Sequence, residues 1–172
     1  WFELRKTGGG SWSIYQEGTF SPDAHHRWMG SVAMDGNGNM ALGYSVSSGT
    51  LYPSIRYATR LASDATGTLQ GEATLVNGAA SQTSTNRWGD YSSMNVDPSD
   101  DATFWYTNEY LTDSGQGWQT RIGKFVVQSS ATNLYVSKDG TCDGKTPCHA
   151  SIQAAINAAG PVADIKISQG IY

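Results

Sequence analysis

A repeat of about 60 residues constrains the fold more than any other feature of this chain. Four landmarks recur in the same order, with Trp28 and Trp88 separated by 60 positions and Asp35 and Asp97 by 62. Ordered landmarks with so little drift indicate a duplicated structural unit. The landmark pairs are Gly18 and Gly78, Arg27-Trp28 and Arg87-Trp88, Asp35 and Asp97, and the triplets 59–61 and 120–122.

Each copy of the repeat predicts short strands separated by turns. Met40, Leu42, Tyr44 and Val46 alternate with small residues, which is typical of a strand with one buried face. The segments 35–39 and 97–101 are rich in Asp, Gly, Asn and Ser and predict the turns of hairpins. The strands are expected near 11–18, 31–36, 40–46 and 53–60 in the first copy, and near 72–78, 91–96, 102–108 and 117–124 in the second.

Composition excludes several other classes of protein. Charged residues make up only 15% of the chain and glycine contributes 20 residues, which argues against helical bundles and coiled coils. The net charge is -4 and the basic residues are scattered, so we expect no nucleic-acid partner. No apolar run is long enough for a membrane span, and no signal peptide is recognisable. Because the sequence begins at Trp1, we expect a processed product or a piece of a longer protein.

The last forty residues predict a different kind of unit. Small and polar residues at 126–132 suit a linker, and 133–140 predicts a strand and turn, followed by a loop at 141–148. Ile152, Ala155, Ile156 and Ala159 follow helical spacing within 149–159, and Gly160-Pro161 ends the predicted helix. Val162, Ile165 and Ile167 then predict a second strand before the final QGIY.

The wording of two segments resembles known families. The stretch from RWMGSVAMDGNGNMALGYSVSS to WQTRIGKF resembles secreted bacterial multidomain proteins whose repeats form sialidase-like β-propellers. The segment NLYVSKDGTCDGKTPCHASIQAAINAAGPVADIKISQGIY is similar to the entry of right-handed parallel β-helices of the pectin-lyase-like class. These resemblances imply a mainly β protein with two four-stranded antiparallel propeller-like blades and a small strand-helix-strand cap. They place a partial propeller at 1–125 (strand 1–5, blades 11–60 and 71–124), a linker at 126–132 and the β-helix cap at 133–172.

Two groups of residues are candidates for a disulfide or a metal site. Cys142 and Cys148 favour a local disulfide in a chain that resembles secreted proteins, with free thiols or a zinc site beside His149 as the alternatives. Asp35, Asn37 and Asn39 alternate as in the first half of a calcium loop, but the bidentate glutamate that closes such a loop is missing. A hairpin turn explains the same residues without an ion. We therefore expect no cofactor, with Ca²⁺ as the weaker alternative.

Aromatic residues are the candidates for ligand contact. Flat rings bind the apolar faces of sugars, and nearby carboxylates and amides bind the hydroxyl groups. Packing between blades is the competing explanation, above all for Trp28 and Trp88, which share a repeat position. The candidate glycan-binding residues are Asp90, Tyr91, Trp105, Tyr106, Asn108 and Glu109.

Catalysis is the weaker hypothesis. A sialidase would use a tyrosine such as Tyr91 with a carboxylate such as Glu109, and a cluster of arginines for the substrate. The arginines of this chain recur as repeat pairs, which favours structural roles, and no other catalytic motif is present.

The sequence therefore predicts an extracellular or cell-surface structural or adhesive β module that binds glycans or copies of itself and is non-catalytic. The first alternative is a subunit of a self-assembling extracellular filament completed by strand pairing between chains. The second is a fragment of a sialidase-like glycosidase or a β-helix polysaccharide lyase.

Overall fold

The structure, a computed structural model, describes residues 1–113, 117–128, 132–158 and 163–167. The chain divides into two compact units, Trp1–Val127 and Gln128–Tyr172.

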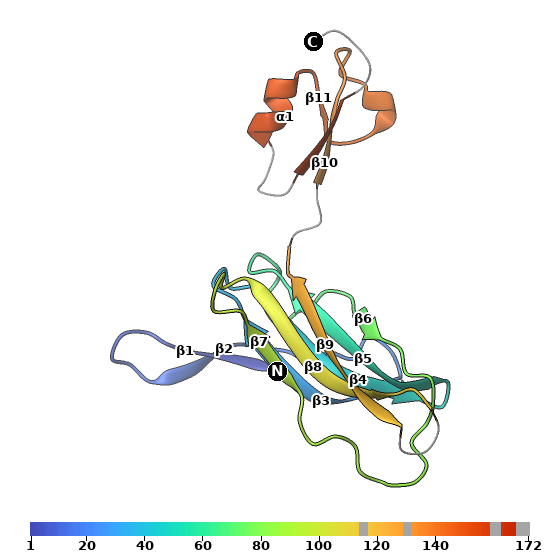
Figure 1. The fold of residues 1–172 in the computed structure, drawn as a ribbon. Helices are drawn as coiled ribbons and strands as arrows, with labels where there is room; N and C mark the ends of the chain where they lie inside the picture. The colour runs from blue at the N-terminus through green and yellow to red at the C-terminus, as the bar shows by residue number, and fades with distance from the viewer. Residues whose placement is uncertain (114–116, 129–131, 159–162, 168–172) are drawn as a thin grey trace. The chain divides into compact units, whose positions relative to one another are not determined.

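Unit 1 contains two antiparallel sheets and a separate hairpin (Figure 1). The first sheet has the order β3-β4-β5-β6, and the second has the order β7-β8-β9. The hairpin pairs β1 with β2 and has no other strand partner among the described residues. The bounds are β1 Phe2–Lys6, β2 Trp12–Glu17, β3 His26–Met34, β4 Met40–Ser48, β5 Leu51–Arg60, β6 Ala73–Val76, β7 Ser93–Val96, β8 Thr103–Leu111 and β9 Trp118–Val126.

The expected strands form, but two of them belong to other sheets than predicted. The strand expected at 11–18 pairs with β1 instead of joining the first sheet. The strand expected to open the second copy, at 72–78, is β6 and pairs with β5. A close approach fixes this edge, because a Cβ on Gly78 would lie 2.0 Å from the carbonyl oxygen of Pro53. The second sheet consequently has three strands within the described residues, not four.

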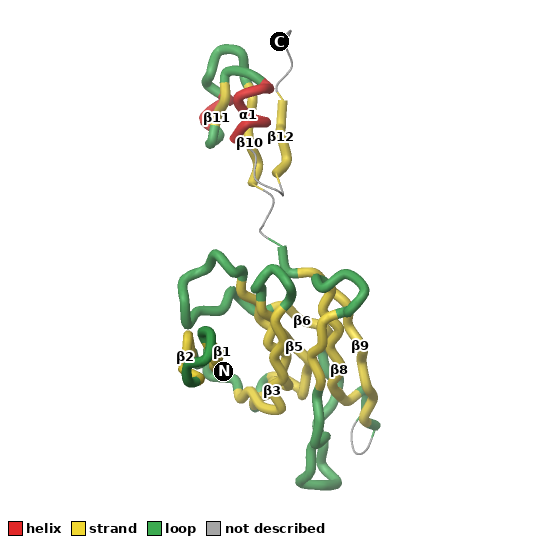
Figure 2. The backbone as a smooth tube through the Cα atoms, turned by 90° about the vertical axis from the view of Figure 1, so that its left-hand side faces the viewer, coloured by secondary structure: helices red, strands yellow, loops and turns green. Residues whose placement is uncertain are grey.

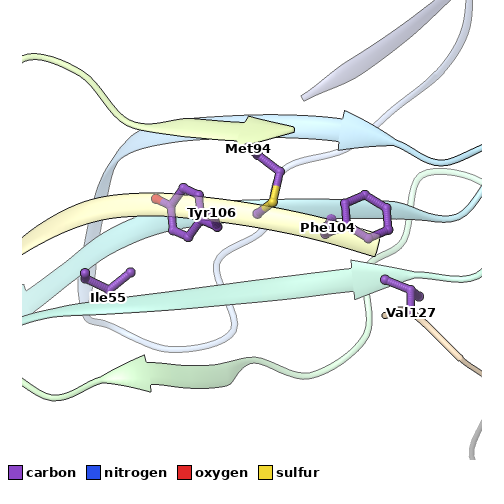
Figure 3. Packing of buried hydrophobic residues seen from close by; sticks show 6 residues of the cluster. Ile55, Met94, Phe104, Tyr106 and Val127 are labelled. Atoms are coloured by element: carbon purple, nitrogen blue, oxygen red, sulfur yellow. The ribbon is translucent and has the colours of Figure 1, made fainter. Parts of the chain in front are cut away.

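The two sheets pack face to face around the main core of unit 1. On β4 the residues that face the second sheet are small, and Gly43 lies directly beneath the ring of Tyr106. Large side chains of β8, including Phe104, fill the space that these small residues leave. Figure 3 shows this packing. The fully or nearly buried members are Ala41, Ile55, Met94, Phe104, Tyr106 and Val127.

The other face of the first sheet carries the larger side chains of β4. Tyr44 and Val46 are buried there, with Phe20 and Leu69 packed against them, which confirms the predicted alternation along β4. Gln16 of the hairpin reaches the same face, where its side-chain nitrogen lies 3.9 Å from the sulfur of Met40. In Figure 2 the hairpin, the first sheet and the second sheet therefore follow one another across unit 1.

The two hairpin turns of the repeat are equivalent in structure. The Asp35 carboxylate accepts the backbone N–H groups of Asn37 and Asn39, and the Asp97 carboxylate accepts that of Ser99. The two turns also lie together, since the backbone N–H of Gly36 donates to the Asp101 carbonyl at 2.9 Å.

The repeat match between residues 59–61 and 120–122 is wrong in register. Arg60 is opposite Met40 at the end of the β4–β5 ladder, whereas Arg121 is opposite Asn108 in the middle of the β8–β9 ladder. Its counterpart by position is Arg56, which is opposite Tyr44. The register differs because the second hairpin turn contains more residues than the first. Met34 pairs with Met40 across the first turn, whereas Val96 pairs with Phe104 across the longer second turn.

Unit 2 is a small parallel sheet covered by a helix. Strand β10 (Thr132–Val136) pairs in parallel with β12 (Ala163–Ile167) and with the short β11 (Cys148–His149). The 3₁₀ turn η1 (Cys142–Gly144) and the helix α1 (Ile152–Ala158) lie between these strands in sequence. Leu134, Val136 and Ala155 form the core of the unit.

The strand-helix-strand order of unit 2 agrees with the prediction, but the helix is shorter than expected. It begins after Ser151, whose hydroxyl accepts the backbone N–H of Ala154 as an N-cap, while His149 belongs to β11. Ile156 is half exposed instead of facing the core. Ala159, Val162 and the QGIY segment lie outside the described residues.

The fold is thus mainly β, with several antiparallel sheets that do not close on themselves within the described residues. Val127, placed in the expected linker, is buried in the core of unit 1. Among the helices that the structure describes, none has the length and apolar character needed to cross a membrane.

Candidate functional site

An aromatic pocket opens on the face of the first sheet that the hairpin adjoins. Its volume is about 210 Å³, below the range of about 300–1,000 Å³ typical of pockets for drug-sized ligands, so it has room for one small ring. Segments far apart in sequence form its walls. The lining residues are Trp1, Thr19, Phe20, Arg27, Trp28, Gly30, Leu42 and Tyr44.

A β-bulge directs Trp28 into the wall of the pocket. The β3–β4 register shifts between Trp28 and Ser31, and Met29 within the bulge has a φ of 51°. The Ser92 hydroxyl donates to the Met29 carbonyl at 2.7 Å, which ties the bulge to the second copy of the repeat. Trp28 then packs edge-on against Trp88, with ring centroids 5.7 Å apart.

The opposite wall comes from the chain around the hairpin. The amino group of Trp1 donates to the Gly18 carbonyl at 3.0 Å, which holds the first residue beside the end of β2. Phe20 tilts against the ring of Tyr44 at a centroid distance of 6.0 Å. The pocket therefore has aromatic rings on both sides of a polar floor.

The polar residues of this floor, Arg27 and Tyr44, belong to a network centred on Glu72, which lies behind them and is not among the lining residues. The carboxylate accepts hydrogen bonds from the Tyr44 hydroxyl at 2.7 Å, from Nε of Arg27 at 2.9 Å and from the guanidinium of Arg56. Arg27 also contacts Asp23 at 2.7 Å. The network contains two arginines and two carboxylates, so its formal charges cancel.

The pKa values of Glu72 and Tyr44 are both shifted within this network. Burial alone would raise the pKa of Glu72, but hydrogen bonds from Tyr44, Arg56 and Arg27 outweigh it and lower the pKa below its ordinary value. Burial, together with the hydrogen bond to Glu72, raises the pKa of Tyr44. At neutral pH the pocket floor thus presents the Tyr44 phenol and the Arg27 guanidinium, whose charge is compensated by Glu72 and Asp23.

The six glycan-binding candidates do not form one site. Tyr106 and Asn108 are buried in the core, where the Asn108 side-chain amide donates to the Tyr106 hydroxyl at 2.8 Å. Their burial leaves them no surface for a ligand.

The other four candidates are not buried with this pair, although the backbone N–H of Glu109 donates to the Asn108 side chain at 2.8 Å. Trp105 lies on the outer face of the second sheet and donates to Asp97. Tyr91 is 91% exposed, and Asp90 forms an ion pair with Arg87. Glu109 accepts the backbone N–H of Gly89.

The Asp35 turn is saturated by its own hydrogen bonds. Its carboxylate accepts two backbone N–H groups and the side-chain amide of Asn39 at 2.8 to 2.9 Å. In the part of the chain that the structure describes, no group of three or more His, Cys, Asp or Glu residues is placed to hold a metal ion. The hairpin-turn interpretation therefore accounts for these residues.

Unit 2 contains the predicted disulfide between Cys142 and Cys148, with the two Cα atoms 5.8 Å apart. An open hollow of about 410 Å³ lies beside it, with the ammonium group of Lys145 5.4 Å from the ring of Tyr135. Among the described residues that line it, this hollow has one aromatic residue, against four in the pocket of unit 1.

Sequence reasoning missed most of the residues of the pocket. Trp28 was expected mainly to pack between blades, and Trp1 was placed only in the expected strand 1–5. Phe20, and Glu72 behind the pocket, carried no recognisable signal because they lie in segments without a motif. Comparison of the chain with protein-family models, with curated proteins and with solved structures finds no match.

Proposed function

We propose that unit 1 is a non-catalytic, extracellular adhesive module that binds a single neutral sugar ring in the aromatic pocket. The observation that carries this proposal is the pairing of aromatic walls with a charge-compensated polar floor in a space for one ring. Apolar sugar faces stack on tryptophan and phenylalanine rings, and directed polar groups at the floor bind hydroxyls.

The charge balance of the floor selects the class of sugar. A sialic acid or uronic acid would need a free arginine for its carboxylate, as Arg–carboxylate pairs are bidentate and strong. Here Arg27 and Arg56 both bind Glu72, and Arg27 binds Asp23 as well. An acidic sugar would have to compete with carboxylates that are already in place, so neutral hexoses and their derivatives fit better.

This balance also bears on the enzyme alternative. Sialidase-like chemistry needs unpaired arginines beside a tyrosine and a carboxylate, but Arg27, the arginine that lines the pocket, is paired with Asp23 and Glu72. Tyr91, the tyrosine considered for catalysis, is not among the residues that line the pocket. The disulfide of unit 2 is compatible with an oxidising, extracellular location.

The test is a glycan array followed by calorimetric titration of the best neutral and acidic ligands. Gly30 lines the pocket, and a Cβ there would meet only ordinary contacts, the nearest at 3.7 Å. Gly30→Leu is therefore expected to fill the pocket without unfolding the sheet and to abolish binding. Gly49→Leu is the matched control, since nothing lies within 4 Å of its Cβ. Binding confined to acidic glycans, or unchanged in Gly30→Leu, would contradict the proposal.

A further inference from the structure

The outer face of the second sheet, called here the open face, exposes large apolar side chains. Strand pairing places Trp105 beside Lys124 and Thr107 beside Ile122, and alternation along β9 puts Trp118 and Val126 on the same surface. Leu111, which pairs with Trp118, is fully buried and is not part of the open face. Contiguous apolar patches on a protein surface mark interaction sites. The exposed members are Trp105 at 38%, Trp118 at 58%, Ile122 at 67% and Val126 at 45%.

The repeat shows what kind of surface covers this face. When the strand ends Met34 and Val96 are matched, Gly43 corresponds to Thr107 and Tyr57 corresponds to Ile122. In the first sheet this surface is covered by the second sheet, with Tyr57 stacked on Phe125 at 4.0 Å. The open face is therefore the repeat equivalent of a buried interface between β-layers, and its natural occupant is another β-layer.

The hairpin at the opposite end of unit 1 offers such a layer. Gln16 and Glu3 point from the hairpin toward the first sheet and bind one another. A β-bulge shifts the pairing between Glu3 and Leu4, so Leu4 pairs with Ile14 and Lys6 with Trp12 on the other side of the hairpin, called here the hairpin face. The large apolar side chains of this face are solvent-exposed. They are Phe2 at 63%, Leu4 at 47%, Trp12 at 67% and Ile14 at 59%.

We propose that the hairpin face of one copy of this chain packs on the open face of a second copy. The hairpin face and the open face both belong to unit 1, and the two sheets lie between them. A two-stranded hairpin is only marginally stable in isolation, so burial of its apolar face also stabilises the hairpin itself.

The contact is head to tail, because two different surfaces meet. Such an interface leaves one free hairpin face and one free open face on every dimer, so it continues into a ring or a linear chain of copies. The packing is face to face, unlike pairing between strand edges. This self-association is a function in addition to sugar binding, and its residues are different from those that line the pocket. The self-association proposal and the sugar-binding proposal can therefore fail independently.

The test uses two double variants of the full chain, analysed by sedimentation velocity. Trp12→Ser/Ile14→Ser removes the hairpin face, and Trp118→Ser/Ile122→Ser removes the open face. Tyr52→Ser is the control, as Tyr52 is 52% exposed on β5 and belongs to neither face.

We expect the wild type and Tyr52→Ser to form oligomers that grow with concentration, and each double variant alone to be monomeric. An equimolar mixture of the two double variants is expected to form dimers and nothing larger, because each supplies one intact surface. Far-UV circular dichroism checks the fold, and Leu4→Lys with Val126→Lys forms a second pair if a serine variant unfolds.

Three results would overturn the proposal. One is a wild type that stays monomeric over its whole soluble range. The second is self-association that persists in either double variant, which would indicate a symmetric contact or pairing of strand edges. The third is a mixture of folded double variants that remains monomeric.

Discussion

Gly43 and Tyr106 are in close contact where the two sheets of unit 1 meet. A Cβ added at Gly43 would lie 2.4 Å from Cζ of the Tyr106 ring, which is nearer than any side chain tolerates. The ring of Tyr106 on β8 therefore requires a residue without a side chain at Gly43 on β4, and this contact sets the distance between the two sheets. The same spacing places Trp88 within reach of the first sheet, where its indole N–H donates to the Ser45 hydroxyl at 3.2 Å.

Gly43→Val is expected to destabilise unit 1 by about 1–3 kcal/mol, the usual cost of overpacking a core. Urea denaturation followed by tryptophan fluorescence measures this change in the free energy of unfolding. Gly49→Val is the control, because its Cβ meets nothing within 4 Å and surface changes normally stay within about 0.5 kcal/mol. Equal stability of Gly43→Val and the control would show that the sheets are spaced differently.

Glu72→Gln is expected to lower the free energy of unfolding by about 1–3 kcal/mol at pH 7, because it leaves partly buried donors of Arg27 and Arg56 without their carboxylate. Glu17→Gln, at an exposed carboxylate, serves as the control. The same variant leaves Arg27, the arginine that lines the pocket, paired with Asp23 alone, so its affinity for acidic sugars should rise relative to that for neutral ones. A variant as stable as wild type would remove Glu72 from the centre of the network.

The stability difference between wild type and Glu72→Gln should depend on pH in one direction. The pKa of Glu72 in the folded chain lies below its ordinary value of 4.5, so its stabilisation is complete above pH 4.5 and is lost as the pH falls through the folded pKa. Denaturation curves of both proteins between pH 7 and pH 3 measure this. A difference that grows on acidification would contradict the assignment.

The Cys142–Cys148 disulfide should stabilise unit 2 by about 2 kcal/mol, as expected for a loop of this length in the chain-entropy description. The double variant Cys142→Ser/Cys148→Ser is expected to lower the melting transition of unit 2 alone, measured by calorimetry. Reductant should reproduce the shift in wild type and leave the double variant unchanged. A shift in the transition of unit 1 would show that the two units do not unfold independently.

Asp35→Ala is expected to destabilise unit 1 more than Asp97→Ala does. Asp35 is 5% exposed and accepts three N–H groups, whereas Asp97 is only partly buried, although hydrogen bonds from Ser99 and Trp105 lower its pKa to about 2. Thermal unfolding with Ca²⁺ or with chelator should give the same melting temperature in wild type, since the Asp35 oxygens already have partners. A melting temperature raised by Ca²⁺ would instead support the calcium-loop interpretation.

Local structure could be predicted from the sequence where neighbouring residues determine it. The alternation along β4, the Asp-rich hairpin turns and the spacing of Cys142 and Cys148 each rest on residues close in the chain. The pairing of β6 with β5 rests on distant contacts, such as the approach of Gly78 to Pro53, which leave no periodic signal. The positions of the strands were therefore predicted better than the pairing between them.

The site was harder to predict for the same reason. On β8 every residue from Phe104 to Tyr110 is aromatic or polar, so the alternation that marks a buried face is hidden. Tyr106 and Asn108 consequently resembled ligand contacts, although they bind one another within the core. The pocket takes Trp1 and Phe20 from segments outside the two sheets, and only the folded chain brings them to Trp28.

The most direct test of sugar binding in the pocket is a nitrogen-15 NMR titration of the tryptophan indole N–H signals with the best neutral glycan. The account predicts saturable shifts of the Trp1 and Trp28 signals, with Trp105 and Trp118 unchanged because they lie on the open face. Shifts confined to Trp105 and Trp118, or no shift of Trp28 at saturating glycan, would contradict it.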